Sequence, residues 1–149
     1  KRFGAREGAP LIRLGAIRET AGGASGLCWS NIYVPTSFAA LGDHLGRDAT
    51  PVYQIIEREF DVRAASVRLD IEACAIANPI ARHLEIAYGT PGLKVTRTYA
   101  DAKERVFEVS VSLHPADRFT YSFTFDKLAQ GADTRPQASN GAGAAADMI

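Results

Sequence analysis

The stretch from Arg105 to His114, RVFEVSVSLH, alternates apolar and polar side chains. Because successive side chains of a strand point to opposite faces, this alternation predicts a β-strand with two unlike faces. One face carries four apolar side chains: Phe107, Val109, Val111 and Leu113. The other face carries four polar ones: Glu108, Ser110, Ser112 and His114. The apolar face is expected to pack in a core, so the chain must build a sheet around this strand.

Other segments supply the neighbours of this strand. Further strands are predicted over residues 11–18, 27–34, 62–77, 93–99 and 119–125. The Gly-rich stretch 20–26 joins the first two as a hairpin, and the turn 101–104 joins 93–99 to the Arg105 strand. The two hairpins also echo each other, since Arg18 precedes Pro35 much as Arg97 precedes Pro115. This indicates an internal pseudo-repeat of strand pairs around a pseudo-twofold axis.

Two helices are predicted between the strands. Thr50-Pro51 is typical of an N-cap and first helical position, and apolar residues then recur at helical spacing from Val52 to Phe60. Asn78-Pro79 predicts the start of a second, short helix carrying Ile80 and Leu84, which the turn 89–92 ends. The expected fold is therefore α+β, a mainly antiparallel sheet with flanking helices.

Length and composition limit what such a fold can do. The 149 residues suffice for one domain, and 17 basic against 17 acidic residues give no overall attraction to nucleic acid. No apolar run approaches the roughly 20 residues that span a bilayer, and the start of the chain lacks the apolar stretch of a signal peptide. We expect a cytoplasmic protein with no membrane association.

Composition also divides the chain into a linker, a domain and a tail. Residues 1–10 are basic and small, which is typical of an interdomain linker, and residues 129–149 are expected to form a disordered tail because they contain almost nothing to bury. The domain is expected to cover 11–128. Trp29 and Tyr33 are predicted to lie in its core, and Cys28 and Cys74 to be buried thiols.

The motifs of the common enzyme and metal sites do not occur in the sequence. There is no phosphate-binding glycine loop, zinc-binding helix motif or nucleophile elbow, and no cysteine spacing that would hold zinc. His44 and His83 are interpreted as surface histidines. We therefore expect no catalytic residues, no metal and no cofactor.

The polar face of the Arg105 strand allows two interpretations. It is either a solvated sheet face or a pocket in which a carboxyl group, two hydroxyls and an imidazole bind a small polar molecule. Arg18 and Arg97 each end an apolar strand, where they either reach to water or clamp a carboxylate or phosphate. Thr50 either caps its own helix or contributes to an anion site.

Several short motifs resemble those of one family. They run in order from Tyr33-Val34-Pro35-x-x-Phe38 through Pro51-Val52-Tyr53, Glu72, Gly89-Thr90-Pro91, Arg97-Thr98-Tyr99-x-Asp101 and Phe107-Glu108-x-Ser110 to Asp117-Arg118-Phe119-x-Tyr121. This order resembles the UTRA domain, the effector-binding half of GntR-type transcriptional regulators of the HutC subfamily. The resemblance implies a chorismate-lyase-like fold, a small-molecule pocket, a homodimer, and operator DNA binding by an N-terminal winged helix-turn-helix domain that this chain lacks.

The family's sugar-phosphate sensors differ from this chain at several pocket positions. Those sensors have an Arg-x-Arg motif, of which this chain keeps only the second arginine, Arg18, because Ala16 stands at the first position. They also have a serine at the helix start, where this chain has Pro51, although the tyrosine that follows is matched by Tyr53. Their first acid and late tyrosine correspond to Ser30 and His114. The missing guanidinium at Ala16 and the missing hydroxyl and backbone N–H at Pro51 each remove a contact worth roughly 1.5–3 kcal/mol to a phosphate, so we expect a small carboxylate rather than a sugar phosphate.

The predicted ligand-binding residues are Arg18, Ser30, Thr50, Tyr53, Arg97, Glu108, Ser110 and His114. In this hypothesis Arg18 and the helix start bind the carboxylate, while Glu108 and His114 contact a hydroxyl, amine or ring nitrogen at its other end. The leading function is effector sensing that alters DNA binding by the attached domains. The alternatives are a dimerisation module with a vestigial pocket and an enzyme resembling chorismate lyase.

Overall fold

The computed structural model describes residues 9–19, 26–46 and 50–124. The chain divides into two units, Lys1–Phe119 and Thr120–Ile149, and the fold below belongs to the first. The tail expected at 129–149, most of the linker expected at 1–10, and nearly all of the loop 20–26 lie outside the described residues.

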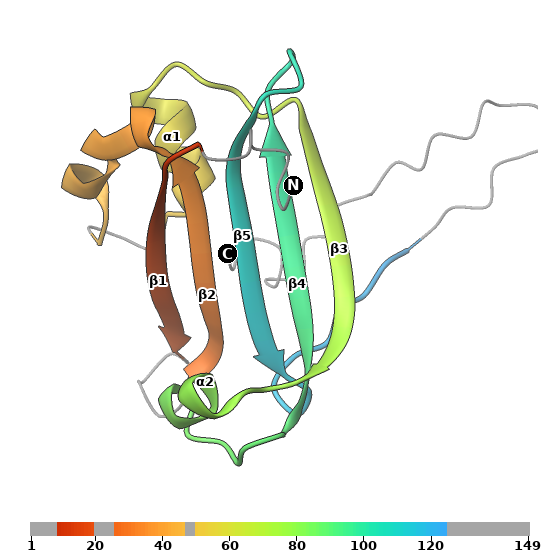
Figure 1. Cartoon of the computed structure of the whole chain (residues 1–149). Helices are drawn as coiled ribbons and strands as arrows, with labels where there is room; N and C mark the ends of the chain where they lie inside the picture. The colour runs from red at the N-terminus through yellow and green to blue at the C-terminus, as the bar shows by residue number, and fades with distance from the viewer. Residues whose placement is uncertain (1–8, 20–25, 47–49, 125–149) are drawn as a thin grey trace, which may run out of the picture. The chain divides into compact units, whose positions relative to one another are not determined.

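Within the described residues, five antiparallel strands form one sheet (Figure 1). In sheet order they are β1 (Leu11–Glu19), β2 (Gly26–Pro35), β5 (Val106–Pro115), β4 (Pro91–Ala100) and β3 (Ser66–Ala75). The two expected hairpins are β1–β2 and β4–β5, and they meet where β2 pairs with β5 in the middle. The α+β class and the antiparallel sheet are thus confirmed, and the hairpins are arranged about the centre as the pseudo-repeat predicts.

In the part of the chain that the structure describes, three helices flank the sheet. They are the 3₁₀ helix η1 (Thr36–His44), α1 (Val52–Glu59) and α2 (Asn78–His83). The first was not predicted, although Phe38 and Leu41, which it buries, have the three-residue spacing of a 3₁₀ helix. The predicted N-cap Thr50 is wrong by one residue, because the Pro51 carbonyl accepts the first backbone bonds of α1.

The second helix also begins one residue earlier than predicted. Its N-cap is Ala77, so Asn78 is already helical, and Leu84 is the C-cap. The preceding strand is shorter than predicted, since β3 starts at Ser66 rather than at Val62. Val62 packs instead on the core cluster beneath α1.

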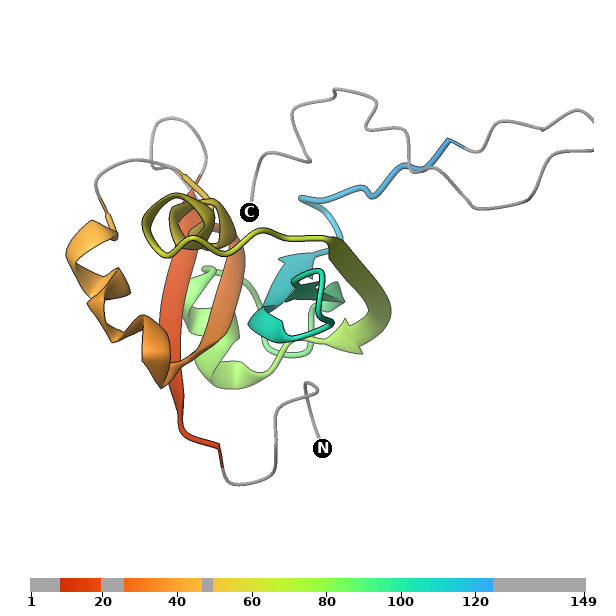
Figure 2. The same cartoon turned by 90° about the horizontal axis from the view of Figure 1, so that it is seen from above.

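Two separate apolar clusters hold the helices in place. The larger one joins β2, β4 and β5 to η1 and α1 through Ile32, Val34, Phe38, Leu41, Ile55, Ile56, Tyr99 and Phe107. The smaller one lies under α2 and contains Ile76, Ala81 and Leu84. Figure 1 shows α1 and η1 at one end of the sheet and α2 at the other, and Figure 2 shows the same elements from above. The middle of the sheet therefore lies between the two clusters.

The prediction that Trp29 and Tyr33 belong to the core is wrong for Tyr33 and holds only in part for Trp29, which packs against the smaller cluster without being fully buried. The buried side chains of β2 are Cys28, Ser30, Ile32 and Val34, while Trp29 and Tyr33 are half-buried on the opposite face. The His83 ring of α2 stacks on Trp29 with centroids 4.8 Å apart. Cys28 is buried as expected, but Cys74 is only half-buried.

The predicted strand 119–125 is also wrong over its described part, 119–124, which is neither strand nor helix. Period-2 alternation gives a segment strand propensity, but a strand requires a hydrogen-bonded ladder as well. The turn that follows β5 directs the Phe119 ring against His114 instead.

Candidate functional site

Four polar side chains of the central strand β5 lie inside the protein. We call Glu108, Ser110, Ser112 and His114 the polar row. Their exposed fractions are 3%, 0%, 0% and 3%. The interpretation of this face as solvated is therefore wrong. The strand is the middle one of the described sheet, between β2 and β4.

Neighbouring strands add further polar groups to the same face. Ser30 of β2 lies opposite Ser112, and their hydroxyl oxygens are 2.8 Å apart. Arg97 of β4 lies opposite Ser110 and is only 7% exposed, so it does not reach to water. Arg18 of β1 lies opposite Cys28 and is half-buried. Arg18 and Arg97 thus lie on the same face as the row, on strands to either side of β5, and the positive charges of both act on His114.

Three atoms of the row lack hydrogen-bond partners within the part of the chain that the structure describes. They are Glu108 Oε2, Ser110 Oγ and His114 Nε2, all of them buried. Native proteins satisfy nearly all buried polar groups, since an unsatisfied one costs about 1–3 kcal/mol. Three such atoms on one strand face are accounted for if a polar ligand or ordered water completes their bonding.

Burial also sets the charge of the row. Removal from water raises the pKa of Glu108 to about 8. It also lowers the pKa of His114 to about 4, helped by the positive charges of Arg97 and Arg18. Near pH 7 both side chains are therefore neutral, with Glu108 able to donate a proton in a hydrogen bond. The guanidinium groups supply the charge of the site, which suits an anion.

Aromatic residues lie at the two ends of the row. At one end the Phe119 ring stacks on His114 with centroids 3.9 Å apart. The adjacent Arg118 is anchored, because it donates to the carbonyl oxygens of Gly26 and Leu84 at 2.6 and 2.9 Å. At the other end Tyr99 lies opposite Glu108.

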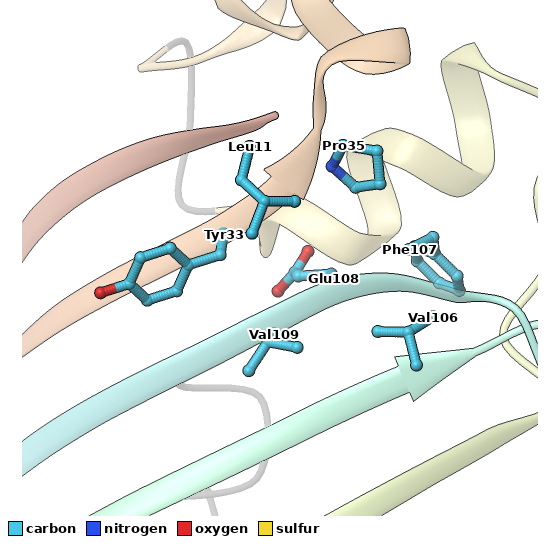
Figure 3. A pocket seen from close by; sticks show the side chains of 7 residues that line it. All are labelled: Leu11, Tyr33, Pro35, Val106, Phe107, Glu108 and Val109. Carbon is cyan, nitrogen blue, oxygen red and sulfur yellow. The ribbon is translucent and has the colours of Figure 1, made fainter. Parts of the chain in front are cut away.

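A small groove opens at the Glu108 end, where β2 and β5 extend past their last paired residues. Figure 3 shows the Glu108 carboxyl group among the apolar side chains that line it. The lining residues are Leu11, Tyr33, Pro35, Val106, Phe107, Glu108 and Val109. Its cavity volume is about 30 Å³, room for about one water molecule. Of the polar row, Glu108 is the residue that lines this groove.

The predicted site residues do not all meet. Arg18, Ser30, Arg97, Glu108, Ser110 and His114 share one face of the sheet, according to the strand registers. Tyr53 lies on α1 and stacks on Tyr99 with centroids 4.5 Å apart, while its hydroxyl accepts a bond from Gln54. Thr50 is half-buried before the start of α1, off the sheet.

Two residues that contact the site were not predicted as part of it. Phe119 contacts His114, and Tyr99 connects the Tyr53 ring to the Glu108 end of the row. Both stand within the motifs that carry the family resemblance. Only the stacking geometry shows what they contact, so the sequence signal was their motif position alone.

The unusual pKa of Glu108 predicts a pH dependence of stability. Between about pH 6.5 and about pH 8 the folded protein keeps the Glu108 proton while the unfolded chain has lost it. The free energy of unfolding should therefore fall as pH rises, by about 2 kcal/mol at 1.36 kcal/mol per pH unit. Below pH 6.5 the lowered pKa of His114 acts in the opposite sense and offsets this slope.

The measurement is urea unfolding at several pH values, with Glu108→Gln as the matched variant. The variant should show little change in unfolding free energy between pH 6.5 and 8. An equal slope in both proteins would mean that the folded-state pKa of Glu108 is not raised.

The fold and the buried row define a class of protein. An antiparallel α+β sheet with convergent polar groups inside it is a scaffold for binding a small molecule. Within the described residues, no three His, Cys, Asp or Glu side chains converge as metal ligands. Among the described helices, none has the length and apolar character needed to cross a bilayer.

The chain belongs to the UTRA family, whose model matches residues 1–120. It is a UTRA effector-binding domain of the kind found in GntR-family transcriptional regulators. No curated protein matches it.

Solved structures share the fold. The ligand-binding domain of a protein assigned to the GntR family, from Bordetella bronchiseptica, has a TM-score of 0.72 at 23% identity, covering 81% of this chain and 78% of that one. The effector domain of PhnF from Mycobacterium smegmatis has a TM-score of 0.71 at 20% identity, with coverage of 84% and 75%. The C-terminal domain of Yurk from Bacillus subtilis has a TM-score of 0.66 at 15% identity, with coverage of 76% and 77%.

Proposed function

We propose that this chain senses a small carboxylate for a HutC-type transcriptional regulator in the cytoplasm. The ligand binds at the polar row and changes operator binding by an N-terminal winged helix-turn-helix domain, which acts as part of a homodimer. One observation carries the proposal: three buried atoms of the row lack protein partners in the described structure, beside two guanidinium groups.

The charge balance of the row supports a singly charged anion. Arg97 and Arg18 supply positive charge, whereas Glu108 is neutral near pH 7. A carboxylate held by a guanidinium fork forms two parallel charge-assisted bonds. The protonated Glu108 and the neutral His114 are then free to bond a hydroxyl, an amine or a ring nitrogen at the other end of the ligand.

The same face offers less to a sugar phosphate. Ala16 has no guanidinium, and Pro51 has neither a hydroxyl nor a backbone N–H. Ser30 is already engaged with Ser112, so its hydroxyl does not replace the acid of the sugar-phosphate sensors. A doubly charged phosphate would therefore lack donors that its charge requires.

The side chains of the polar row suit ligand binding rather than catalysis. Glu108 is the single acid among its side chains, and as a neutral group it is a hydrogen-bond donor. We infer that the domain, of residues 11–128, binds its ligand without converting it. Coupling to DNA requires that the ligand bind two conformations of the regulator with different affinities.

The test is thermal unfolding of the chain against hydroxy-carboxylates, aromatic carboxylates, amino acids, sugar phosphates, phosphonates and chorismate. A ligand that binds only the folded state stabilises it by about 2.7 kcal/mol at a hundredfold excess over Kd. A concentration-dependent rise in Tm with a carboxylate is the expected result. Pyruvate release is measured in the chorismate samples and should be zero.

Other outcomes assign the domain differently. A rise with sugar phosphates alone would contradict the proposed ligand class, and pyruvate release would contradict a sensor without catalysis. If no compound raises Tm, the dimerisation module with a vestigial pocket becomes the better interpretation.

A further inference from the structure

The groove at Glu108 is too small to admit a carboxylate ligand. Its cavity volume of about 30 Å³ holds about one water molecule. The four side chains of the polar row are at most 3% exposed. A ligand of several atoms therefore reaches these side chains only after a group that covers them has moved.

Phe119 covers the opposite end of the row. Its ring stacks on His114, with centroids 3.9 Å apart and an angle of 26° between the two planes. Phe119 is half-buried, whereas His114 is 3% exposed, so the phenyl ring shields the imidazole from solvent. Figure 1 shows that β5 ends at the same end of the sheet as α2. The covered end of the row is thus the end away from the Glu108 groove.

The Phe119 ring packs on the polar row rather than in a hydrophobic core. It belongs to neither of the two apolar clusters found in the described residues. The turn before it is held by Arg118, whose backbone N–H donates to the Pro115 carbonyl at 3.1 Å. The Arg118 guanidinium also donates to the carbonyl oxygens of Gly26 and Leu84. Because Arg118 holds the turn, the phenyl ring can leave the imidazole by rotation about its own side-chain bonds.

The positive charge of the site acts at the His114 end of the row. Besides burial, the charges of Arg97 and Arg18 lower the pKa of His114. The same two charges act on the Cys28 thiol of β2, where they oppose the rise in pKa that burial causes. At the other end of the row, burial raises the pKa of Glu108. An anion attracted by the two guanidinium groups therefore approaches the row beside His114.

The imidazole of His114 has an unused hydrogen-bonding atom at this end. Its Nε2 is buried without a partner in the described part of the chain. A phenyl ring stacked on the imidazole offers this atom neither a donor nor an acceptor. A ligand with a polar group can complete the bonding of Nε2, which gives it an advantage over the Phe119 ring in the same place.

We propose that Phe119 occupies the place of the ligand against His114 and competes with it. In the free protein the ring covers the row, and a carboxylate binds when the ring has turned out to solvent. The measured affinity is then the intrinsic affinity reduced by the fraction of molecules in which the ring is out. Phe119 thus sets how tightly the domain binds its ligand. The competition rests on the proposed function, because it assumes a carboxylate at the polar row.

Movement of Phe119 also affects other elements. The preceding residue, Arg118, bonds Gly26 at the start of β2 and Leu84 at the end of α2, at 2.6 and 2.9 Å. A ligand that displaces Phe119 therefore acts on the turn that connects β5 to β2 and α2.

Titration calorimetry of the 149-residue chain with benzoate, lactate and glutamate tests the competition. Any of these carboxylates that binds the wild-type protein should bind Phe119→Ala at least fivefold more tightly. A merely structural role of the ring predicts the opposite, a weaker affinity. Phe123→Ala is the matched control, because Phe123 is an aromatic residue of the same segment that is 53% exposed. This variant should leave the affinity unchanged.

Modification of histidine by diethyl pyrocarbonate tests the cover without a ligand. The reagent reacts with neutral imidazole, and burial holds the pKa of His114 near 4, so access limits its reaction at pH 7. Mass spectrometry of the peptides should show His114 reacting at least tenfold faster in Phe119→Ala than in the wild-type protein. His44 and His83, which lie outside the polar row, are the internal references and should react at unchanged rates.

A second variant guards against loss of the fold. Arg118→Met releases the turn but keeps the phenyl ring, so it should also speed up the reaction of His114. Thermal unfolding checks that each variant is folded, and Arg118→Met replaces Phe119→Ala in both measurements if the alanine variant is not.

Two results would overturn the proposal. One is an unchanged reaction rate of His114 in the folded variants, and the other is an equal or weaker carboxylate affinity in Phe119→Ala. A faster reaction of His114 without binding of any of the three carboxylates would support the cover and contradict the proposed ligand class. Failure of the competition is thus distinguishable from failure of the proposed function.

Discussion

Replacing Arg97 by methionine is expected to weaken binding of a stabilising carboxylate at least thirtyfold. Arg97 is 7% exposed and lies opposite Ser110 in the polar row. Truncating one partner of a buried, hydrogen-bonded charge pair costs about 2–5 kcal/mol. Methionine keeps most of the side-chain length without the charge, so the loss of affinity measures the contribution of the guanidinium group to ligand binding. Titration calorimetry with the most stabilising carboxylate of the thermal screen provides the affinity.

A second measurement separates electrostatics from general damage to the fold. The positive charge of Arg97 helps to hold the pKa of His114 near 4. In Arg97→Met, NMR spectra of the His114 ring protons should therefore show that His114 titrates at a higher pH. Arg105→Met is the control, because Arg105 is exposed on the β4–β5 turn and bonds Asp101 there. Unchanged carboxylate affinity in Arg97→Met would contradict the role of Arg97 as the anion clamp.

Replacing Gly92 by alanine is expected to lower the free energy of unfolding by about 3 kcal/mol. A Cβ at this position would lie 2.6 Å from the carbonyl oxygen of His114 and 2.9 Å from Cδ1 of Ile76. The first contact is with backbone of the adjacent strand, which cannot move without disturbing the ladder. Overpacking in a core commonly costs about 1–3 kcal/mol, and the backbone clash places Gly92 at the upper end.

Gly42→Ala is the matched control for this prediction. Nothing lies within 4 Å of a Cβ built on Gly42, so alanine there should leave stability nearly unchanged or raise it slightly. Urea unfolding of the three proteins gives the comparison. Equal stabilities of Gly92→Ala and the wild-type protein would show that β4 and β5 can separate at this end without loss.

Gly92 also shows a limit of structure prediction from local sequence patterns. The sequence assigns it to the turn that ends the second helix, because Gly89, Pro91 and Gly92 are typical turn residues. In the structure the strand β4 already begins at Pro91. Gly92 is a position where two strands and the α2 cluster come together, and such a contact has no signal in local composition.

The polar row is a similar case on the functional side. Alternation correctly places Glu108, Ser110, Ser112 and His114 on one face of β5. It cannot distinguish a solvated face from a buried one, because the distinction depends on which elements cover the face. The position of β5 at the centre of the sheet and the Phe119 ring on His114 make the row buried.

The sequence by itself determined the five strands of the described sheet and both α-helices to within a few residues, the two hairpins and the family. These depend on local periodicity, capping residues and motif order, all of which act over short distances along the chain. Tertiary structure alone decided which face of β2 is buried, that residues 119–124 form no strand, and that the polar row is enclosed. Burial and strand pairing depend on segments far apart in sequence, so they arise only when the sheet is assembled.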